Sequence, residues 1–123
     1  MDILLADDDE KIRKALGGLL TSLGHTVRTA SNGLEALDRM AAATPDLVIT
    51  DIRMPEMDGL ALLKTARCRY PETPVVLMTA NLDVDVGATA FRDGAWDCLG
   101  KPIRVEDLLA CVEGVQQRAL LNE

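Results

Sequence analysis

The stretch Leu47-Val48-Ile49-Thr50-Asp51-Ile52-Arg53-Met54-Pro55-Glu56-Met57-Asp58-Gly59 decides the fold of this chain. Its apolar start is typical of a strand buried on both faces of a sheet, and Asp51 follows where that strand ends. Met54-Pro55 then predicts an extended or turn conformation, because proline fixes its own φ and restricts the residue before it. Asp58-Gly59 predicts a cap and a flexible hinge before the next helix. The stretch therefore predicts a strand that carries one carboxylate to the rim of a sheet.

The composition limits the classes of function. With 123 residues, of which 48% are hydrophobic, the chain predicts one domain that buries about two thirds of its unfolded surface. The formal net charge is −7 and Lys and Arg form no cluster, so we expect this segment to bind neither nucleic acid nor a membrane directly. No apolar run reaches membrane-spanning length, Met1-Asp2 does not begin a signal peptide, and the three cysteines show no CxxC spacing. These features predict a cytoplasmic protein with reduced thiols.

Strand and helix patterns alternate five times along the chain. Strands are predicted at residues 3–6, 25–30, 47–49, 75–78 and 96–99, and helices at residues 12–23, 32–43, 60–69, 82–92 and 105–115. This alternation predicts an α/β fold in which helices cover both faces of a parallel sheet. In such folds the ligand site lies beyond the carboxyl ends of the strands, near the point where the strand order reverses.

Parts of this pattern are weak. Gly17-Gly18 destabilise the first helix by about 1 kcal/mol each relative to Ala, so its packing must compensate. The fourth helix contains four mediocre or poor helix formers, Val84, Val86, Gly87 and Thr89. Residues 116–123 lose clear periodicity, so we expect a domain at residues 1–119 and a tail or the start of a linker to an output domain at residues 120–123.

Polar groups stand at the ends of four predicted strands: Asp7-Asp8, Asp51, Thr79 and Lys101. Carboxylates held within a few ångströms repel one another, and a hard cation such as Mg²⁺ resolves the conflict. Lys101 offers a positive charge to a phosphoryl oxygen, Thr79 offers a hydroxyl, and Ala80 leaves space beside it. Taken alone, the aspartates would be interpreted as a helix cap, and Lys101 would be interpreted as a surface lysine. Together, the four strand ends favour a metal site at which Asp51 attacks phosphorus and forms an aspartyl phosphate.

In these motifs the sequence resembles the receiver domains of bacterial two-component response regulators, over essentially residues 2–119. The motifs are Asp7-Asp8, Asp51 with Met54-Pro55 and Gly59, Thr79-Ala80, and Lys101-Pro102. The residues around Asp51 and the stretch Gly94-Ala95-Trp96-Asp97 are similar to receivers of nitrogen-regulation-type transcription activators. The resemblance implies a doubly wound, flavodoxin-like (βα)₅ fold with a five-stranded parallel sheet of strand order 2-1-3-4-5.

The resemblance also implies a role for each site residue. Asp51 would be the phosphoacceptor. Asp8, Asp51 and the backbone carbonyl of Arg53 would hold Mg²⁺, and Asp7 would act largely through water.

On the other side of Asp51, Lys101 would contact the phosphoryl group. A cis bond to Pro102 would aim it inward, and Thr79 would move toward the phosphoryl group on activation. The donor would be a phosphohistidine on a histidine kinase or a phosphotransfer protein. The chain would catalyse only its own phosphorylation and dephosphorylation. It would switch the surface of the fourth helix, fifth strand and fifth helix to control a transcriptional output domain, and we expect a homodimer through the same surface.

Two positions depart from the family pattern. Cys98 stands where the family usually has a Tyr or Phe that swings inward with Thr79, and Arg104 stands where a Ser or Asp often caps the last helix. Strand alternation predicts that Trp96 shares a face with Cys98, so we expect the Trp96 indole to carry the coupling that the Tyr or Phe usually provides.

Arg53 and Asn81 follow Asp51 and Thr79 at a distance of two residues, so we expect both at the mouth of the site. There the Arg53 guanidinium would shield the phosphoryl group from water.

Three other functions stay open as alternatives. A phosphohydrolase that forms an aspartyl phosphate commonly has a second Asp two positions after the nucleophile, where this chain has Arg53. A flavodoxin-like cofactor module would carry a Gly/Thr-rich phosphate loop after the first strand, and this chain has Asp7-Asp8-Asp9 there. A phosphorylation-independent interaction module would normally lack the acidic residues.

Overall fold

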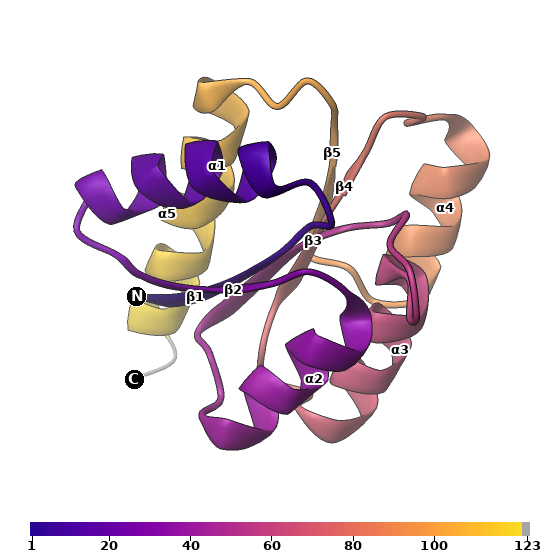
Figure 1. Cartoon of the computed structure of the whole chain (residues 1–123), viewed down its shortest axis with the longest axis horizontal. Helices are drawn as coiled ribbons and strands as arrows, with labels where there is room; N and C mark the ends of the chain where they lie inside the picture. The colour runs from indigo at the N-terminus through magenta and orange to yellow at the C-terminus, as the bar shows by residue number, and fades with distance from the viewer. Residues whose placement is uncertain (122–123) are drawn as a thin grey trace.

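Strands and helices alternate in the computed structural model, which describes residues 1–121 (Figure 1). The strands are β1 (Asp2–Ala6), β2 (Thr26–Ala30), β3 (Leu47–Asp51), β4 (Val75–Thr79) and β5 (Asp97–Gly100). The helices are α1 (Glu10–Ser22), α2 (Gly33–Ala42), α3 (Gly59–Arg69), α4 (Val84–Arg92) and α5 (Val105–Leu121). The alternation predicted from sequence is therefore confirmed.

All the strand pairs are parallel, and the order in the sheet is β2-β1-β3-β4-β5, as the family resemblance implies. Helices α1 and α5 cover one face of the sheet, and α2, α3 and α4 cover the other (Figure 1). The central strands contribute to both layers, because successive side chains of a strand point to opposite faces. Ile3 and Leu5 of β1 enter the core under α1 and α5, whereas Leu4 and Ala6 enter the core under the other three helices.

Four helices begin at a capping side chain. The residues Asp9, Asn32, Asp58 and Asp83 each accept a hydrogen bond from a backbone N–H in the first turn of the helix that follows. A full capping box does not form at the start of α2. Asn32 accepts from the Glu35 amide, but the Glu35 carboxylate accepts from the amide and hydroxyl of Ser31 instead of from Asn32.

The largest difference from the sequence prediction lies at the C-terminal end. Helix α5 continues through Leu121, beyond residue 115 where the apolar periodicity fades, so residues 116–121 are helical and not frayed. The apolar pattern stops because Val115 is the last buried residue of the helix, Gln116, Gln117 and Arg118 are polar, and Leu120 and Leu121 are exposed. Asn122 and Glu123 lie outside the described residues, and the domain boundary at residue 119 stays a prediction. Within residues 1–121, no helix combines the length and the apolar character that a membrane crossing needs.

The paired glycines of α1 have different surroundings. A Cβ on the buried Gly17 would lie 3.8 Å from Val27 Cγ1 and 3.9 Å from Leu5 Cδ2, which are ordinary van der Waals distances, so this position faces the sheet. Gly18 is exposed, and a Cβ there would meet no atom within 4 Å. Gly18 therefore weakens α1 without a packing gain.

We predict that Gly18→Ala raises the free energy of unfolding by about 1 kcal/mol, because Ala loses less conformational entropy in a helix. Urea unfolding followed by circular dichroism measures the change. Gly24→Ala is the matched comparison, since Gly24 also has open surroundings but a φ of +94°. That variant should lose about 1–2 kcal/mol, the penalty of a left-handed conformation for a residue with a Cβ. An unchanged or lower stability of Gly18→Ala would contradict the assignment.

Candidate functional site

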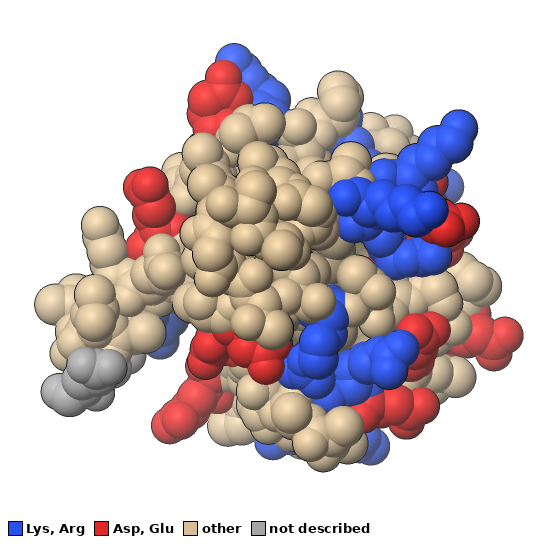
Figure 2. Space-filling view, turned by 60° about the vertical axis from the view of Figure 1, so that its left-hand side comes forward, with Lys and Arg blue, Asp and Glu red and all other residues tan. Residues whose placement is uncertain are grey.

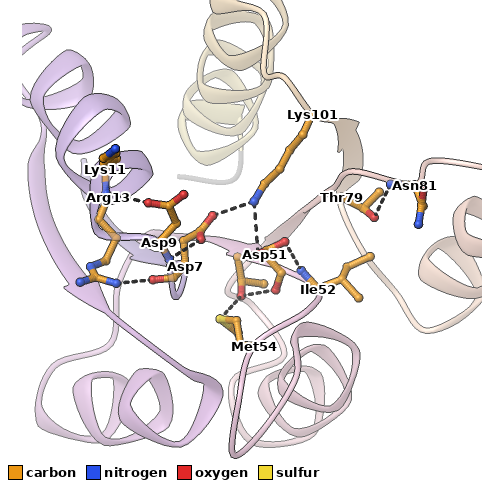
Figure 3. A network of polar contacts seen from close by, with 11 residues as sticks. Asp7, Asp9, Lys11, Arg13, Asp51, Ile52, Met54, Thr79, Asn81 and Lys101 are labelled. Atoms are coloured by element: carbon orange, nitrogen blue, oxygen red, sulfur yellow. Dashed lines mark hydrogen bonds and ion pairs between the residues drawn. The ribbon is translucent and has the colours of Figure 1, made fainter.

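Three charged side chains meet at the carboxyl ends of the strands. The Nζ of Lys101 lies 2.9 Å from Asp7 Oδ2 and 3.2 Å from Asp51 Oδ2, so one ammonium group joins the ends of β1 and β3 (Figure 3). Asp7 is fully buried, and Asp51 is 7% exposed. These distances bring Asp7, Asp51 and Lys101, three of the residues predicted for the site, together at one end of the sheet.

The turn after β1 fixes Asp7 from several directions. Its amide donates to the Ala30 carbonyl of β2, and its Oδ1 accepts from the amide of Asp9, which in turn caps α1. Arg13 of α1 donates from Nη1 to the Asp7 carbonyl at 2.6 Å. The polar atoms of the buried residue are thus bonded on several sides, as burial requires.

The backbone after β3 lies close to the start of α3. The Ile52 amide donates both to Asp51 Oδ1 and to the Met78 carbonyl, and the Gly59 amide donates to the Ile52 carbonyl at 2.7 Å. A Cβ on Gly59 would overlap the carbonyl oxygen of Asp51 and approach Ile52 Cα to 2.8 Å. Gly59 is therefore needed for this close approach, which corrects its interpretation as a flexible hinge.

The loop between Asp51 and α3 contains a tight turn. The Met57 amide donates to the Pro55 carbonyl at 2.8 Å, and Glu56 between them has a φ of 68°, which is left-handed. The Met57 carbonyl accepts from the Gly33 amide at 2.9 Å and so ties the loop to the start of α2. The turn predicted from Met54-Pro55 is present, and its outer end is held by α2.

A cation site fits the acidic residues of this region. Carboxylate oxygens of Asp7, Asp8 and Asp51 all lie within 4.8 Å of one another. Mg²⁺ binds oxygen ligands at about 2.0–2.1 Å in an octahedron, so its ligand atoms are separated by about 3–4 Å. The three predicted aspartates are therefore close enough to share one ion or its bound waters. The Arg53 carbonyl, predicted as a further ligand, stays a prediction, and the Arg53 side chain is exposed.

Burial and charge oppose each other in the titration of Asp51 and Lys101. Burial raises the pKa of Asp51, the nearby Asp7 raises it further, and Lys101 only partly offsets both, so the pKa lies above its ordinary value. For Lys101, burial lowers the pKa, but the hydrogen bonds and charges of Asp7 and Asp51 outweigh it, so the pKa is raised. The surroundings therefore favour the charged form of Lys101 and disfavour the ionised form of Asp51 relative to a solvent-exposed Asp.

The remaining residues predicted for this site come from β4 and the loops beside it. Thr79 is buried at the end of β4, and its Oγ1 accepts from the amide of the exposed Asn81 at 3.1 Å. Figure 3 shows Thr79 on the side of Asp51 that faces away from Asp7, and Ala80 is exposed. The Lys101-Pro102 bond is cis, as the resemblance implies.

Trp96 and Cys98 lie on opposite faces of the sheet, which contradicts the prediction that they share one. Trp96 packs into the core under α1 and α5, with the Arg118 guanidinium 5.0 Å from its ring centre. Cys98 packs into the core under α2, α3 and α4. The prediction failed because β5 begins at Asp97, and the alternation of faces holds only within a strand.

The Cys98 environment does not suit a reactive thiol. Burial, together with the neighbouring charge of Asp97, raises the pKa of Cys98. The thiol therefore stays protonated, in agreement with its interpretation as a small packing residue.

Three contributors to the site were missed in the sequence. They are the Arg13 guanidinium, the Ile52 amide and the close approach at Gly59. For Arg13 the spacing held a signal, because it lies four residues after the cap Asp9 and so on the helix side that faces the turn. Backbone contacts such as those of Ile52 and Gly59 leave no signal of this kind.

Comparisons with known proteins agree with the fold and the motifs. A family model described as the response regulator receiver domain matches residues 3–113. Similar relatives include the DNA-binding transcriptional regulator NtrC of Escherichia coli (strain K12), which is 45% identical over 90% of this chain and 24% of the relative. The regulatory protein AtoC of the same strain is 42% identical over 96% of this chain and 25% of the relative. The chain thus spans about a quarter of the length of these curated relatives.

Two solved structures illustrate the structural similarity. A response regulator receiver domain protein from Clostridium thermocellum has a TM-score of 0.91 and 31% identity, with 99% of this chain and 98% of that chain covered. NtrX from Brucella abortus in complex with ADP has a TM-score of 0.90 and 34% identity, with 98% of this chain and 28% of that chain covered. The similarity to nitrogen-regulation-type receivers that the sequence indicated is therefore confirmed.

We predict that Asp51→Asn raises the melting temperature of the metal-free protein near neutral pH, because it removes a carboxylate that folding forces into an unfavourable charged state. The raised pKa means that the folded state holds this proton more tightly than the unfolded chain does. The parent therefore loses stability as pH rises from the ordinary Asp pKa through the raised value, and the advantage of the variant grows over the same window.

Thermal melts in chelator at about pH 4 and about pH 7 test this difference. Asp38→Asn, at an exposed position of α2, is the control and should change little. Added Mg²⁺ should stabilise the parent more than Asp51→Asn, since binding to the folded state raises the melting temperature. A variant that is less stable than the parent at neutral pH would show that the ion pair with Lys101 outweighs the repulsion.

Proposed function

The chain belongs to the response regulator receiver domain family, and we propose that Asp51 accepts a phosphoryl group in a Mg²⁺-dependent reaction. The donor is a phosphohistidine on a histidine kinase or a phosphotransfer protein. The observation that carries this proposal is the contact of the Lys101 ammonium with Asp7 and Asp51, beside an exposed Asp8, at one end of the sheet. These side chains place a phosphoryl acceptor (Asp51), a positive charge (Lys101) and the carboxylate oxygens of three aspartates within one small region.

The proposed reaction is a direct displacement at phosphorus. An Asp51 carboxylate oxygen forms the new P–O bond while the P–N bond to the imidazole breaks, and the imidazole leaves with the electron pair. Lys101 moves from the carboxylates to a phosphoryl oxygen, whose charge it balances, and Thr79 donates its hydroxyl to another. The Ile52 amide stays on Asp51 Oδ1 and holds the carboxyl group in place.

The metal would be held by the carboxylates of Asp8 and Asp51 and the carbonyl of Arg53, with Asp7 acting through water. Bound there, Mg²⁺ supplies positive charge for the oxygens of the transferred group. The spacing of the aspartates supports this assignment, because their repulsion otherwise opposes gathering them at one end of the sheet.

The rival functions have less support. A phosphohydrolase would need an acid or base near the nucleophile, but Arg53 occupies the position where an Asp is common, and its side chain is exposed. The first turn of α1 contains the acidic Glu10, which does not suit the phosphate of a flavin. A receiver that works without phosphorylation would not need the buried Asp7 and Asp51 with their lysine partner.

We propose that phosphorylation of Asp51 changes the surface formed by α4, β5 and α5. Large apolar side chains are exposed on or beside α4 and at the start of α5: Leu82, Val84, Phe91 and Val105. Exposed apolar groups of this kind suit an interface, and we propose that they contribute to a homodimer or to contact with a transcriptional output domain.

Direct contact of this segment with nucleic acid or a membrane is not part of the proposal. The net charge is −7, and on the face in Figure 2 basic side chains lie beside acidic ones. We propose a cytoplasmic location, in keeping with the three free cysteines. The only catalysis proposed for the chain is its own phosphorylation and dephosphorylation.

We predict that acetyl phosphate with Mg²⁺ adds one phosphoryl group to the protein and that Asp51→Asn abolishes the addition. Intact-protein mass spectrometry measures the added mass, and omission of Mg²⁺ should also prevent it. Asp38→Asn, on the exposed face of α2, should be labelled like the parent. Undiminished labelling of Asp51→Asn would refute Asp51 as the acceptor, and phosphate release from common phosphomonoesters would favour the hydrolase.

A second prediction concerns the lifetime of the phosphoryl group. Arg53 is exposed two residues after Asp51, from where its guanidinium can reach the phosphoryl oxygens. Arg53→Ala should therefore lose the group about two- to fivefold faster, as expected for an exposed charge interaction of about 0.5–1 kcal/mol. Arg69→Ala, in the last turn of α3, is the charge-matched control. Loss at the parent rate or slower would show that Arg53 does not protect the group.

A further inference from the structure

Arg13 belongs to the polar network in Figure 3 but has no part in the chemistry proposed above. It is half-buried on α1, and its backbone amide donates to the Asp9 carbonyl at 3.1 Å. Its side chain turns back toward the start of the helix, and Nη1 donates to the Asp7 carbonyl at 2.6 Å. Arg13 thus clamps the turn between β1 and α1 from the side of the helix.

The carbonyl that Arg13 contacts belongs to the peptide group joining Asp7 to Asp8. A peptide group is planar, so a fixed carbonyl also fixes the direction in which the chain continues to the Asp8 Cα. Asp7 has further anchors, because its side chain is bonded to the Asp9 amide and to Lys101. Asp8 is exposed, so the direction of its carboxylate depends on the backbone that carries it.

We propose that Arg13 is a positioning residue that sets the Mg²⁺ affinity of the site by fixing the Asp7–Asp8 peptide group. This inference rests on the proposed function, in which Asp8 is a metal ligand. A hydrogen bond from a guanidinium is charge-assisted, and partial burial strengthens it. Groups that orient metal ligands typically change metal affinity about 10–100-fold when they are removed.

The charge of Arg13 acts in the opposite direction. A guanidinium is positive at every accessible pH and repels a divalent cation, so the loss of charge alone would tighten Mg²⁺ binding. Lys101 already places a cation 2.9 Å from Asp7 and 3.2 Å from Asp51, in direct contact with the carboxylates. The Arg13 guanidinium is instead bonded to a backbone oxygen. Its effect on Mg²⁺ affinity through the position of the peptide group should therefore exceed the effect of its charge.

Three variants separate these effects. Arg13→Gln removes both the charge and the planar guanidinium, and Arg13→Lys keeps the charge but offers a single ammonium group as donor. Lys14→Gln removes the same charge from the next residue of α1, whose exposed ammonium pairs with Glu10. The dissociation constant for Mg²⁺ is measured by calorimetry on each metal-free protein, and the backbone amide signals of Asp8 and Asp9 are compared by NMR before Mg²⁺ is added.

Arg13→Gln should weaken Mg²⁺ binding about tenfold and move both amide signals, with Arg13→Lys in between. Lys14→Gln should stay within about twofold of the parent, as expected for an exposed charge. An Arg13→Gln protein with a lower melting temperature but unchanged or tighter Mg²⁺ binding would overturn the proposal. If Arg13→Gln does not fold, Arg13→Lys against Lys14→Gln provides the same comparison.

Failure of the proposed function gives a different result. In that case the parent itself binds no Mg²⁺ at millimolar concentration. The amide signals of the metal-free proteins then still decide whether Arg13 orients the turn, and unmoved signals in Arg13→Gln would refute that orientation.

Discussion

The ion pairs of Lys101 with Asp7 and Asp51 hold together a site that its other charges would drive apart. Lys101 is 94 residues from Asp7 in the sequence, so the pairs form only when β1, β3 and the loop after β5 are all in place. One ammonium cannot balance three carboxylates, and two negative charges remain at the cluster of Asp7, Asp8 and Asp51. Two negative charges suit one divalent cation, so the same imbalance that weakens the metal-free fold provides affinity for Mg²⁺.

The topology of the sheet makes this cluster possible with short side chains. Asp reaches only a short distance from the backbone, so the two strand ends must be neighbours. The order β2-β1-β3-β4-β5 places β1 beside β3, and Thr50 of β3 pairs with Ala6, the residue before Asp7. The close contact of Gly59 with the backbone of Asp51 and Ile52 holds the loop after β3, and the Ile52 amide bonds Asp51 Oδ1. The strand order thus places the ligands, and the loop backbone orients them.

The sequence allowed the fold and most of the site to be predicted because apolar periodicity and strand-end polar residues are local signals. Asp7, Asp51 and Lys101 were found in this way, and their contacts follow from the rule that parallel strands end at one edge. Trp96 was assigned to the wrong face, because the start of a strand is set by its pairing and not by its own residues. The clamp by Arg13 was missed for a related reason. Its spacing from Asp9 places Arg13 on the helix side that faces the turn, but this spacing does not tell whether the guanidinium bonds to the backbone or turns toward solvent.

Under the proposed function, the contacts of Thr79 connect the site to the start of α4. Its hydroxyl oxygen already accepts from the Asn81 amide, but a hydroxyl also has one hydrogen to donate. Thr79 can therefore bond a phosphoryl oxygen without releasing Asn81, and a shift of Thr79 draws the following loop with it. Asp83, the cap of α4, lies two residues beyond Asn81, and α4 has weak helix propensity and exposes Val84 and Phe91. The loop from Thr79 to Asp83 is the direct covalent connection between the site and α4, and the small Cys98 puts no bulky side chain at its position of β5.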